Sequence, residues 1–184
     1  MIKNIIFDLG NVVYKLNWSK DLEKFTNIAT EKKLLSQVMF ESKEWIKLDQ
    51  GIITRREAIN IMKKKLPSNL HIACEKLVNN WSDSLILNSQ MFNFIKAVRK
   101  KGYKIYILSN APIESRAFFK QNGILQFFDG AIFSAEEKIV KPDKRIYKIL
   151  LNRYNLRAEE CLFLDDRKEN IDSALELNFN RICF

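Results

Sequence analysis

The sequence contains a single histidine and only three cysteines among its 184 residues. His71 stands alone in a stretch with helical spacing, so the chain lacks the ligand pairs of a common zinc site and the imidazole base of a Ser-His-Asp triad. Cys74, Cys161 and Cys183 have no paired spacing, and we interpret them as reduced packing residues. Any acid–base or metal chemistry must therefore come from carboxylates.

Long apolar runs are also missing. No run approaches the ~20 residues that a membrane-spanning helix needs, and Asp8 interrupts the first apolar run too early for a signal peptide. We therefore expect a cytoplasmic protein with no membrane partner. The net charge of +9 permits anionic partners, but the lysines are scattered along amphipathic segments and are not interleaved with aromatic residues. This pattern favours a solvated basic surface over a nucleic-acid site, and its positive field would help to attract a phosphorylated substrate.

The N-terminal region contains a short apolar run that ends in a carboxylate. Residues 5–7 are Ile-Ile-Phe, Asp8 follows, and Gly10 and Asn11 come before the next apolar residues. This is typical of a buried strand that delivers one charged side chain to the edge of a sheet, where ligands bind in open α/β folds. Asp-x-Gly is also common in turns, so the motif alone does not distinguish a site from a turn.

The region from about residue 18 to residue 87 shows only helical spacing of its apolar residues, with no convincing strand. Thr54 and Glu57 form the pattern of a capping box and predict that a helix begins there. All three tryptophans lie in this region, and we interpret them as packing residues of an all-helical subdomain.

From residue 88 the pattern changes to helices that alternate with strands, and Gly102 marks the end of the first helix. Strands are expected over residues 103–108, 131–133, 161–164 and 180–184. The alternation predicts an α/β fold, a Rossmann-like parallel sheet with helices on both faces, formed by residues 1–15 and 88–184. The segment 16–87 is far longer than a crossover between parallel strands needs, and we interpret it as an inserted all-α cap.

Polar groups stand at the ends of the predicted strands or in the loops just after them. They are Asp8, Ser109 with Asn110, Lys141, and Asp165 with Asp166. Each has a structural explanation of its own, such as a helix cap or an exposed loop lysine. Right-handed crossovers, however, bring the ends of parallel strands to one rim. Together these groups would supply what phosphoryl transfer needs, namely a carboxylate nucleophile, a hydroxyl, a cation and carboxylates for Mg²⁺.

In the type and order of these motifs, the chain resembles the haloacid dehalogenase superfamily of hydrolases. The resemblance covers nearly the whole chain and includes the flanking sequences SNAP, SAEEKIVKPDKRIYKILL and LFLDDRKENIDSALELNF. The helical insertion is similar to the caps of the glucose-1-phosphate phosphatase and epoxide-hydrolase phosphatase branch. The resemblance implies that Asp8 is the nucleophile that forms an aspartyl phosphate. It also implies that Ser109 and Asn110 bind the phosphoryl group, and that Lys141 holds phosphate and nucleophile together.

The resemblance further implies a Mg²⁺ site formed by Asp8, the backbone carbonyl of Gly10, and the pair Asp165 and Asp166, with Asp166 as the direct ligand of that pair. Gly10 departs from the family pattern, because most phosphatases of the family carry a second Asp there. That Asp protonates the leaving oxygen and later activates water, and such help is worth ~10²–10⁴ in rate. Water, the substrate or a cap carboxylate could replace it. The loss argues against a phosphomutase. A smaller departure is Asn178, which stands where the family usually has a helix-ending glycine and which tolerates the same left-handed conformation.

The leading hypothesis is a Mg²⁺-dependent phosphatase for a small phosphorylated metabolite, with the cap selecting the substrate. The turn at residues 49–51, Asp-Gln-Gly, would contribute to the pocket, whereas Lys15 and Asn17 either face the pocket or form a solvated hinge. The alternative is a pseudoenzyme that binds a phosphorylated ligand or protein without turnover. A metal-free dehalogenase is a third option, which the acidic pair Asp165–Asp166 disfavours. Neither the substrate nor the oligomeric state can be predicted from the sequence.

Overall fold

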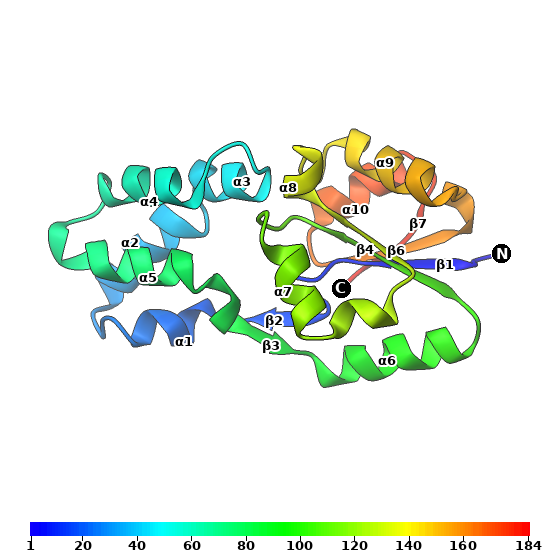
Figure 1. Ribbon diagram of the computed structural model, residues 1–184, viewed down its shortest axis with the longest axis horizontal. Coiled ribbons are helices and arrows are strands. Elements are labelled where there is room, and N and C mark those ends of the chain that lie inside the picture. Colours follow the sequence, from blue (N-terminus) through cyan, green and yellow to red (C-terminus); the bar gives the residue numbers. More distant parts are fainter.

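The computed structural model describes residues 1–184 and contains a five-stranded sheet in the order β5-β4-β1-β6-β7. All neighbouring strands in it are parallel, and helices lie on both sides of the sheet in Figure 1. The predicted α/β class and Rossmann-like arrangement are confirmed. The strands are β1 (Asn4–Phe7), β4 (Lys104–Ser109), β5 (Gly130–Phe133), β6 (Cys161–Asp165) and β7 (Asn180–Cys183).

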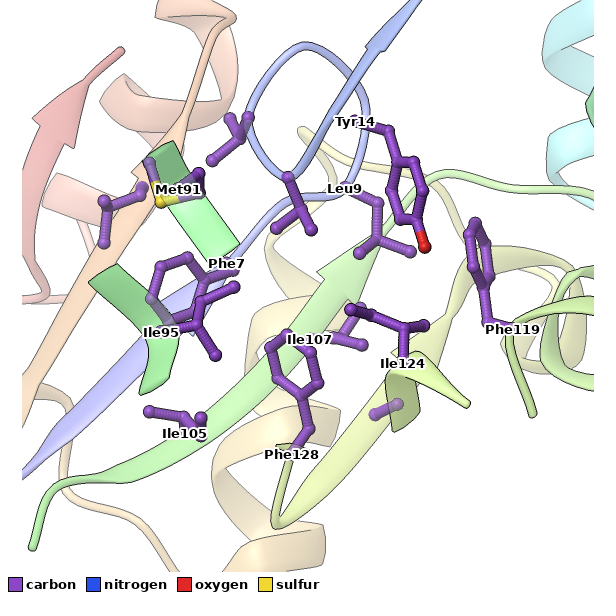
Figure 2. Packing of buried hydrophobic residues seen from close by; sticks show 14 of the residues in the cluster. Phe7, Leu9, Tyr14, Met91, Ile95, Ile105, Ile107, Phe119, Ile124 and Phe128 are labelled. Carbon is purple, nitrogen blue, oxygen red and sulfur yellow. The ribbon is translucent and has the colours of Figure 1, made fainter. Parts of the chain in front are cut away.

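Alternate side chains of β1 pack against two different helical layers. Phe7 lies in the same core cluster as Met91 and Ile95 of α6, and Figure 2 shows these three side chains close together. Ile6 points to the opposite face and packs in the cluster that contains residues of α9 and α10. Because both faces of β1 are covered, its sequence is a continuous apolar run. The helices of this part are α6 (Ser89–Lys100), α7 (Ser115–Gln121), α8 (Ser134–Glu137), α9 (Lys144–Tyr154) and α10 (Lys168–Leu175).

The register of the strands brings the predicted site residues to one rim of the sheet. Phe7 lies beside Ile107 of β4 and Leu164 of β6. Asp8 and Asp165 therefore follow at the same level, and the Asp8 N–H donates to the Leu164 carbonyl at 2.9 Å. This rim is the carboxyl end of the sheet, where open α/β folds bind their ligands.

The remaining helices form a separate lobe beyond the carboxyl end of β1 (Figure 1). A core of 14 buried hydrophobic residues lies inside the lobe, and all of them fall between Leu22 and Val78. The predicted capping box is present, since Thr54 and Glu57 exchange hydrogen bonds at the start of α4. No helix of the chain has the length and apolar character that crossing a bilayer requires. The helices of the lobe are α1 (Trp18–Glu23), α2 (Ala29–Met39), α3 (Lys43–Asp49), α4 (Arg55–Lys63) and α5 (His71–Asn79).

A short antiparallel ribbon joins the lobe to the sheet domain. It pairs β2 (Tyr14–Leu16) with β3 (Leu85–Leu87), with Tyr14 opposite Leu87. The expectation of no strand between about residue 18 and residue 87 is therefore wrong at β3. Three residues are too few to show a strand period, and the apolar run Leu-Ile-Leu reads equally well as the end of a helix. Short 3₁₀ helices complete the chain, η1 (Ser68–Leu70), η2 (Trp81–Ser84), η3 (Ile124–Phe127) and η4 (Ala158–Glu160).

The predicted helix stop at Asn178 is confirmed. Asn178 follows α10 with a φ of 64°, in the left-handed region that asparagine tolerates better than most residues.

Candidate active site

Lys141 lies between two carboxylates at the carboxyl rim of the sheet. Its Nζ is 2.9 Å from Asp8 Oδ1 and 2.6 Å from Asp165 Oδ2, and it also donates to the Leu108 carbonyl at 2.9 Å. The side chains of Lys141 and Asp165 are fully buried. Charges at this depth are tolerated only when they are paired and hydrogen-bonded, so the three side chains form one interdependent unit.

Burial and charge act in opposite directions on Lys141. Burial alone would lower the pKa of the amine, but Asp8 and Asp165 outweigh it and hold the pKa of Lys141 above its ordinary value. Lys141 therefore presents a permanent positive charge. Burial also raises the pKa of Asp8 above its ordinary value, while Lys141 opposes this shift and Asp165 adds to it.

Asp8 has one oxygen fixed and one oxygen free. Oδ1 is held by the Lys141 ammonium, whereas Oδ2 takes part in no ion pair. A Cβ placed on Gly10 would lie 3.9 Å from Asp8 Oδ2, so this oxygen faces the space above Gly10. A carboxylate that is oriented through one oxygen and open at the other has the geometry of a nucleophile.

The hydrogen bonds of Asp165 suit it to hold other groups in place. Its Oδ2 accepts from Lys141, and its Oδ1 accepts from the Arg167 N–H at 2.9 Å and from Asn170 Nδ2 at 2.8 Å. Each oxygen therefore already has a protein donor. Asp165 fixes the lysine and the start of the loop that leads into α10.

Asp166 is the member of the acidic pair that is available to a metal ion. Carboxylate oxygens of Asp8, Asp165 and Asp166 lie within 4.8 Å of one another. Asp166 Oδ2 accepts from Asn11 Nδ2 at 2.9 Å, and its Oδ1 has no hydrogen-bond partner. Mg²⁺ takes oxygen ligands, a few of them from protein and the rest from water. Asp8 and Asp166 fit this requirement, and Gly10 lines the same cleft.

Asn11 is a site residue to which the sequence analysis assigned no role. Its φ is 54°, a left-handed conformation that asparagine tolerates. In this turn its Oδ1 accepts from the Leu16 N–H at 3.3 Å while its Nδ2 reaches Asp166. A Gly-Asn pair directly after a buried strand was the available signal, because such pairs build sharp turns.

The two residues predicted to bind phosphate have different surroundings. Ser109 ends β4, is buried, and its hydroxyl makes no hydrogen bond within the protein. The Asn110 side chain, by contrast, is engaged with the backbone of Lys141 on both its carbonyl and its amide. Ser109 thus offers a free hydroxyl near the rim, while Asn110 holds the lysine loop and keeps one N–H for a ligand.

A cleft of about 390 Å³ opens between this rim and the helical lobe, within the usual size range of ligand pockets. Four groups from the sheet domain, Asp8, Lys141, Asp166 and Arg167, line one side of it. The lobe contributes the opposite side, including Asp49 of the predicted turn. A larger depression of about 700 Å³ exists at the other end of the sheet, around Met1 and Arg157, but none of the candidate catalytic groups lies there.

Three aromatic side chains form the wall of the cleft on the lobe side. Trp18 stacks on Phe40 with ring centroids 4.0 Å apart, and Trp45 meets both rings edge-on at 5.7 Å and 5.2 Å. All three line the cleft together with Leu16. Trp18 and Trp45 do pack against buried clusters, as the sequence predicts. Their second role at the cleft was not predicted, because helical spacing does not show whether a side chain also faces a cavity.

Two of the candidate pocket residues do not line the cleft. The Lys15 side chain is exposed on β2, and Asn17 caps α1 by accepting from the Lys20 N–H at 3.3 Å. Leu16 and Trp18 line the cleft instead. Leu16 follows Lys15 on β2 and therefore points to the other face of the ribbon, and Trp18 is the first residue of α1.

A parallel α/β sheet with a buried lysine and a carboxylate cluster at its carboxyl rim, and a helical lobe over that rim, defines a Rossmann-like hydrolase. Residues 2–178 match the haloacid dehalogenase-like hydrolase family, and the chain belongs to this family.

The relatives include phosphatases with different substrates in their names. The chain is 23% identical over 177 residues to a sesquiterpene phosphatase from Aspergillus oryzae, and this match covers 94% of this chain and 84% of the relative. It is 25% identical over 134 residues to a phosphorylated carbohydrates phosphatase from Thermotoga maritima, over 72% of this chain and 62% of the relative. A drimenol cyclase from Aspergillus calidoustus is 25% identical over the whole chain, which spans only 34% of that protein.

Solved structures share the fold along almost the full length. A haloacid dehalogenase family enzyme from Bacteroides thetaiotaomicron, in complex with magnesium and inorganic phosphate, has a TM-score of 0.72 and 22% identity. The match covers 99% of this chain and 93% of that one.

Proposed function

We propose that this protein is a Mg²⁺-dependent phosphatase that hydrolyses a small phosphorylated metabolite through an aspartyl phosphate on Asp8. The observation that carries the proposal is the buried Lys141 ammonium between Asp8 and Asp165, which leaves Asp8 Oδ2 free toward the cleft. A fixed cation beside an oriented carboxylate suits the transfer of an anionic group. The phosphatases among the relatives support the same reaction.

The reaction has two displacements at phosphorus. In the first, Asp8 Oδ2 bonds to phosphorus while the bond to the leaving-group oxygen breaks, and that oxygen takes up a proton. In the second, water attacks phosphorus and loses a proton, and the bond to Asp8 breaks to release inorganic phosphate. Ser109 and Lys141 bind and orient the phosphoryl oxygens. Mg²⁺ held by Asp8, Asp166 and the Gly10 carbonyl would supply further positive charge against those oxygens.

The cleft favours a phosphate monoester whose organic part has an apolar face. The stacked wall of Trp18, Phe40 and Trp45 lies opposite the charged rim. Such rings bury large apolar areas and would pack against an isoprenoid, an aryl group or the C–H face of a sugar. The basic side chain of Arg167 at the cleft adds attraction for the phosphate.

Gly10 favours one second candidate, a pseudoenzyme that binds a phosphorylated ligand without turnover. Gly10 has no side chain to protonate a leaving group, which is the step that slow leaving groups require. This candidate shares the anion-binding rim with the phosphatase and differs only in turnover.

The discriminating experiment measures phosphate release from p-nitrophenyl phosphate and from a panel of metabolite phosphates with Mg²⁺. Asp8→Asn serves as the control because it keeps the shape of the side chain and removes the nucleophile. Turnover that requires both Mg²⁺ and Asp8 supports the phosphatase. Binding of inorganic phosphate with no turnover on any ester supports the pseudoenzyme, and turnover unchanged in Asp8→Asn contradicts both the nucleophile and the proposed mechanism.

A further inference from the structure

We propose that Asp49, a residue of the helical lobe, is the proton donor and acceptor that replaces the side chain missing at Gly10. The proposal rests on the proposed phosphatase function and adds to it a catalytic residue from a different part of the chain. Four lines of observation carry it: position, anchoring, lack of partners, and the absence of a competing carboxylate.

Asp49 lies at the junction of two cavities that meet above Gly10. It lines the main cleft together with Asp8, and it also lines an adjoining cavity of about 130 Å³ together with Ser109. Gly10 and Asn110 likewise line both. A Cβ on Gly10 would meet only Leu16 Cδ1 at 3.4 Å and Asp8 Oδ2 at 3.9 Å. The space that an Asp side chain would occupy at position 10 is therefore open to a group that approaches from the lobe.

The backbone around Asp49 is fixed to the sheet domain. The Asp49 carbonyl accepts a hydrogen bond from Ser134 Oγ, and Ser134 Oγ in turn accepts from the Ala111 N–H at 2.9 Å. Gln50 Nε2 donates to the Lys138 carbonyl at 3.0 Å, and Lys138 Nζ donates to the Gly51 carbonyl.

Gly51 allows this close approach of the turn to α8. Its φ is 66°, and a Cβ there would lie 2.6 Å from the Ala135 carbonyl oxygen. Figure 1 shows α3, which ends at Asp49, beside α8. An anchored turn places its carboxyl group without further ordering, as catalysis by a positioned acid requires.

The Asp49 carboxyl group has no hydrogen-bond or ion-pair partner in the protein. A partly buried carboxyl without a partner costs stability unless it serves a ligand. The charged groups that face it are Asp8, Lys141 and Arg167, and the apolar rings of Trp18 and Trp45 line the same cleft. Burial, with a further contribution from Asp8, raises the pKa of Asp49 to about 8. Burial thus favours the protonated form of the group, which is the form that an acid must have.

No other carboxylate of the lobe competes for the role. Glu44 pairs with Lys65, and Asp21 pairs with Lys24 and Ser84. The rest lie away from the cleft, because Asp49 is the one lobe carboxylate among the residues that line it.

The chemistry balances without an additional reagent. As Asp8 Oδ2 bonds to phosphorus and the ester bond breaks, the Asp49 carboxyl gives its proton to the leaving oxygen. The resulting carboxylate then takes a proton from the water that attacks the aspartyl phosphate, which restores the protonated Asp49 for the next cycle.

The test compares wild type and Asp49→Asn on two esters of similar size, p-nitrophenyl phosphate and phenethyl phosphate, with Mg²⁺. The nitrophenolate group of the aryl ester leaves without being protonated, whereas the alkoxide group of the alkyl ester needs a proton to leave. We expect kcat on the alkyl ester to fall about 10²-fold or more, within the usual range for a lost general acid, and kcat on the aryl ester to change much less.

Asp83→Asn is the matched control, because Asp83 is an exposed carboxylate of the lobe outside the cleft. It should leave both activities unchanged. Adding Gly10→Asp should restore alkyl turnover in Asp49→Asn by tenfold or more, since that magnitude lies within general-acid effects, and should have little effect in wild type.

Several outcomes would overturn the assignment. Equal losses on both esters would make Asp49 a positioning residue, and no loss on the alkyl ester would remove it from the mechanism. An equal gain from Gly10→Asp in both backgrounds would show that Asp49 supplied no proton. If wild type cleaves neither ester, or if Asp8→Asn is fully active, the proposed function itself fails and the acid assignment fails with it.

Discussion

Asn110 and Lys141 hold each other through a reciprocal pair of hydrogen bonds. Asn110 Nδ2 donates to the Lys141 carbonyl at 3.0 Å, and the Lys141 N–H donates to Asn110 Oδ1 at 2.8 Å. This pair joins the end of β4 to the loop before α9. Since the Lys141 side chain crosses from that loop to β1 and β6, the position of its ammonium depends on Asn110.

Asn110→Leu should therefore lower both stability and activity. The variant keeps the size of the side chain but removes both hydrogen bonds and leaves polar backbone groups of a buried residue without partners. We expect the free energy of unfolding to fall by ~1–3 kcal/mol, as measured by urea denaturation. Phosphatase kcat should fall more than KM changes. Unchanged stability would mean that water or another donor replaces Asn110.

Lys141→Met should lower the free energy of unfolding more than the removal of a charge from the protein surface would. It leaves the buried carboxylates Asp8 and Asp165 facing each other with no cation. Loss of one partner of a buried charge network costs ~3–5 kcal/mol. The double variant Lys141→Met/Asp165→Asn should recover part of that stability, and an additive loss would contradict the coupling of the two side chains.

Asp166→Asn should lower the apparent affinity for Mg²⁺ and have little effect on the stability of the fold. Asp166 Oδ1 has no protein partner, and the side chain is only partly buried. We expect the Mg²⁺ concentration for half-maximal activity to rise by about tenfold or more, as typical for a change at a metal site, with little change in melting temperature. Chelation should abolish turnover. Normal Mg²⁺ dependence in this variant would assign the ion to other ligands.

The pH dependence of stability should report on Asp49 in the metal-free protein. Its pKa is raised to about 8 in the folded state and has its ordinary acidic value in the unfolded chain. The folded state therefore binds an additional proton between about pH 4 and about pH 8, and stability from this group is lost as pH rises through that window. Each rise of one pH unit within the window lowers the free energy of unfolding by up to ~1.4 kcal/mol.

Asp49→Asn lacks this titration. The difference between its unfolding free energy and that of wild type should therefore increase in favour of the variant as the pH rises from about 4, and it should become constant above about pH 8. The measurement is a set of denaturation curves at several pH values in the presence of a chelator. A constant difference between the two proteins would show that the pKa of Asp49 is not raised.

Trp45→Ala should change which esters are hydrolysed. The ring forms part of the apolar wall of the cleft. Its loss should lower kcat/KM for apolar phosphates such as phenethyl phosphate by ~10-fold or more, because a buried aromatic group contributes ~1.5–3 kcal/mol. Glycerol phosphate, which has no apolar face, serves as the comparison and should be affected less. Equal losses would assign Trp45 to the packing of the lobe.

The sequence was sufficient to predict the rim and an inserted helical cap, but not which side chains of the cap face the rim. Asp8 and Asp165 lie at the ends of buried strands, and parallel strands bring such ends together. The strand pattern of the sequence alone therefore predicts that the two carboxylates lie close to each other. The direction of Asp49 depends on how α3 docks on α8 through Ser134 and Gly51, residues far apart in sequence. Likewise, Trp18 and Trp45 share the spacing of core residues, and only the tertiary arrangement places them at a cavity.

The lobe is joined to the sheet domain by a covalent connection and by noncovalent contacts, and this has a mechanical consequence. The β2–β3 ribbon is covalently continuous with both parts, whereas the noncovalent contacts include the hydrogen bonds of Asp49 and Gly51 to α8 and the ion pair of Arg55 with Glu114. Movement of the lobe about the ribbon would have to break these noncovalent contacts, and it would carry Asp49 away from Asp8. The proposed proton donor is therefore in place only while the lobe is docked on the sheet domain, which is also the arrangement that excludes bulk water from the cleft.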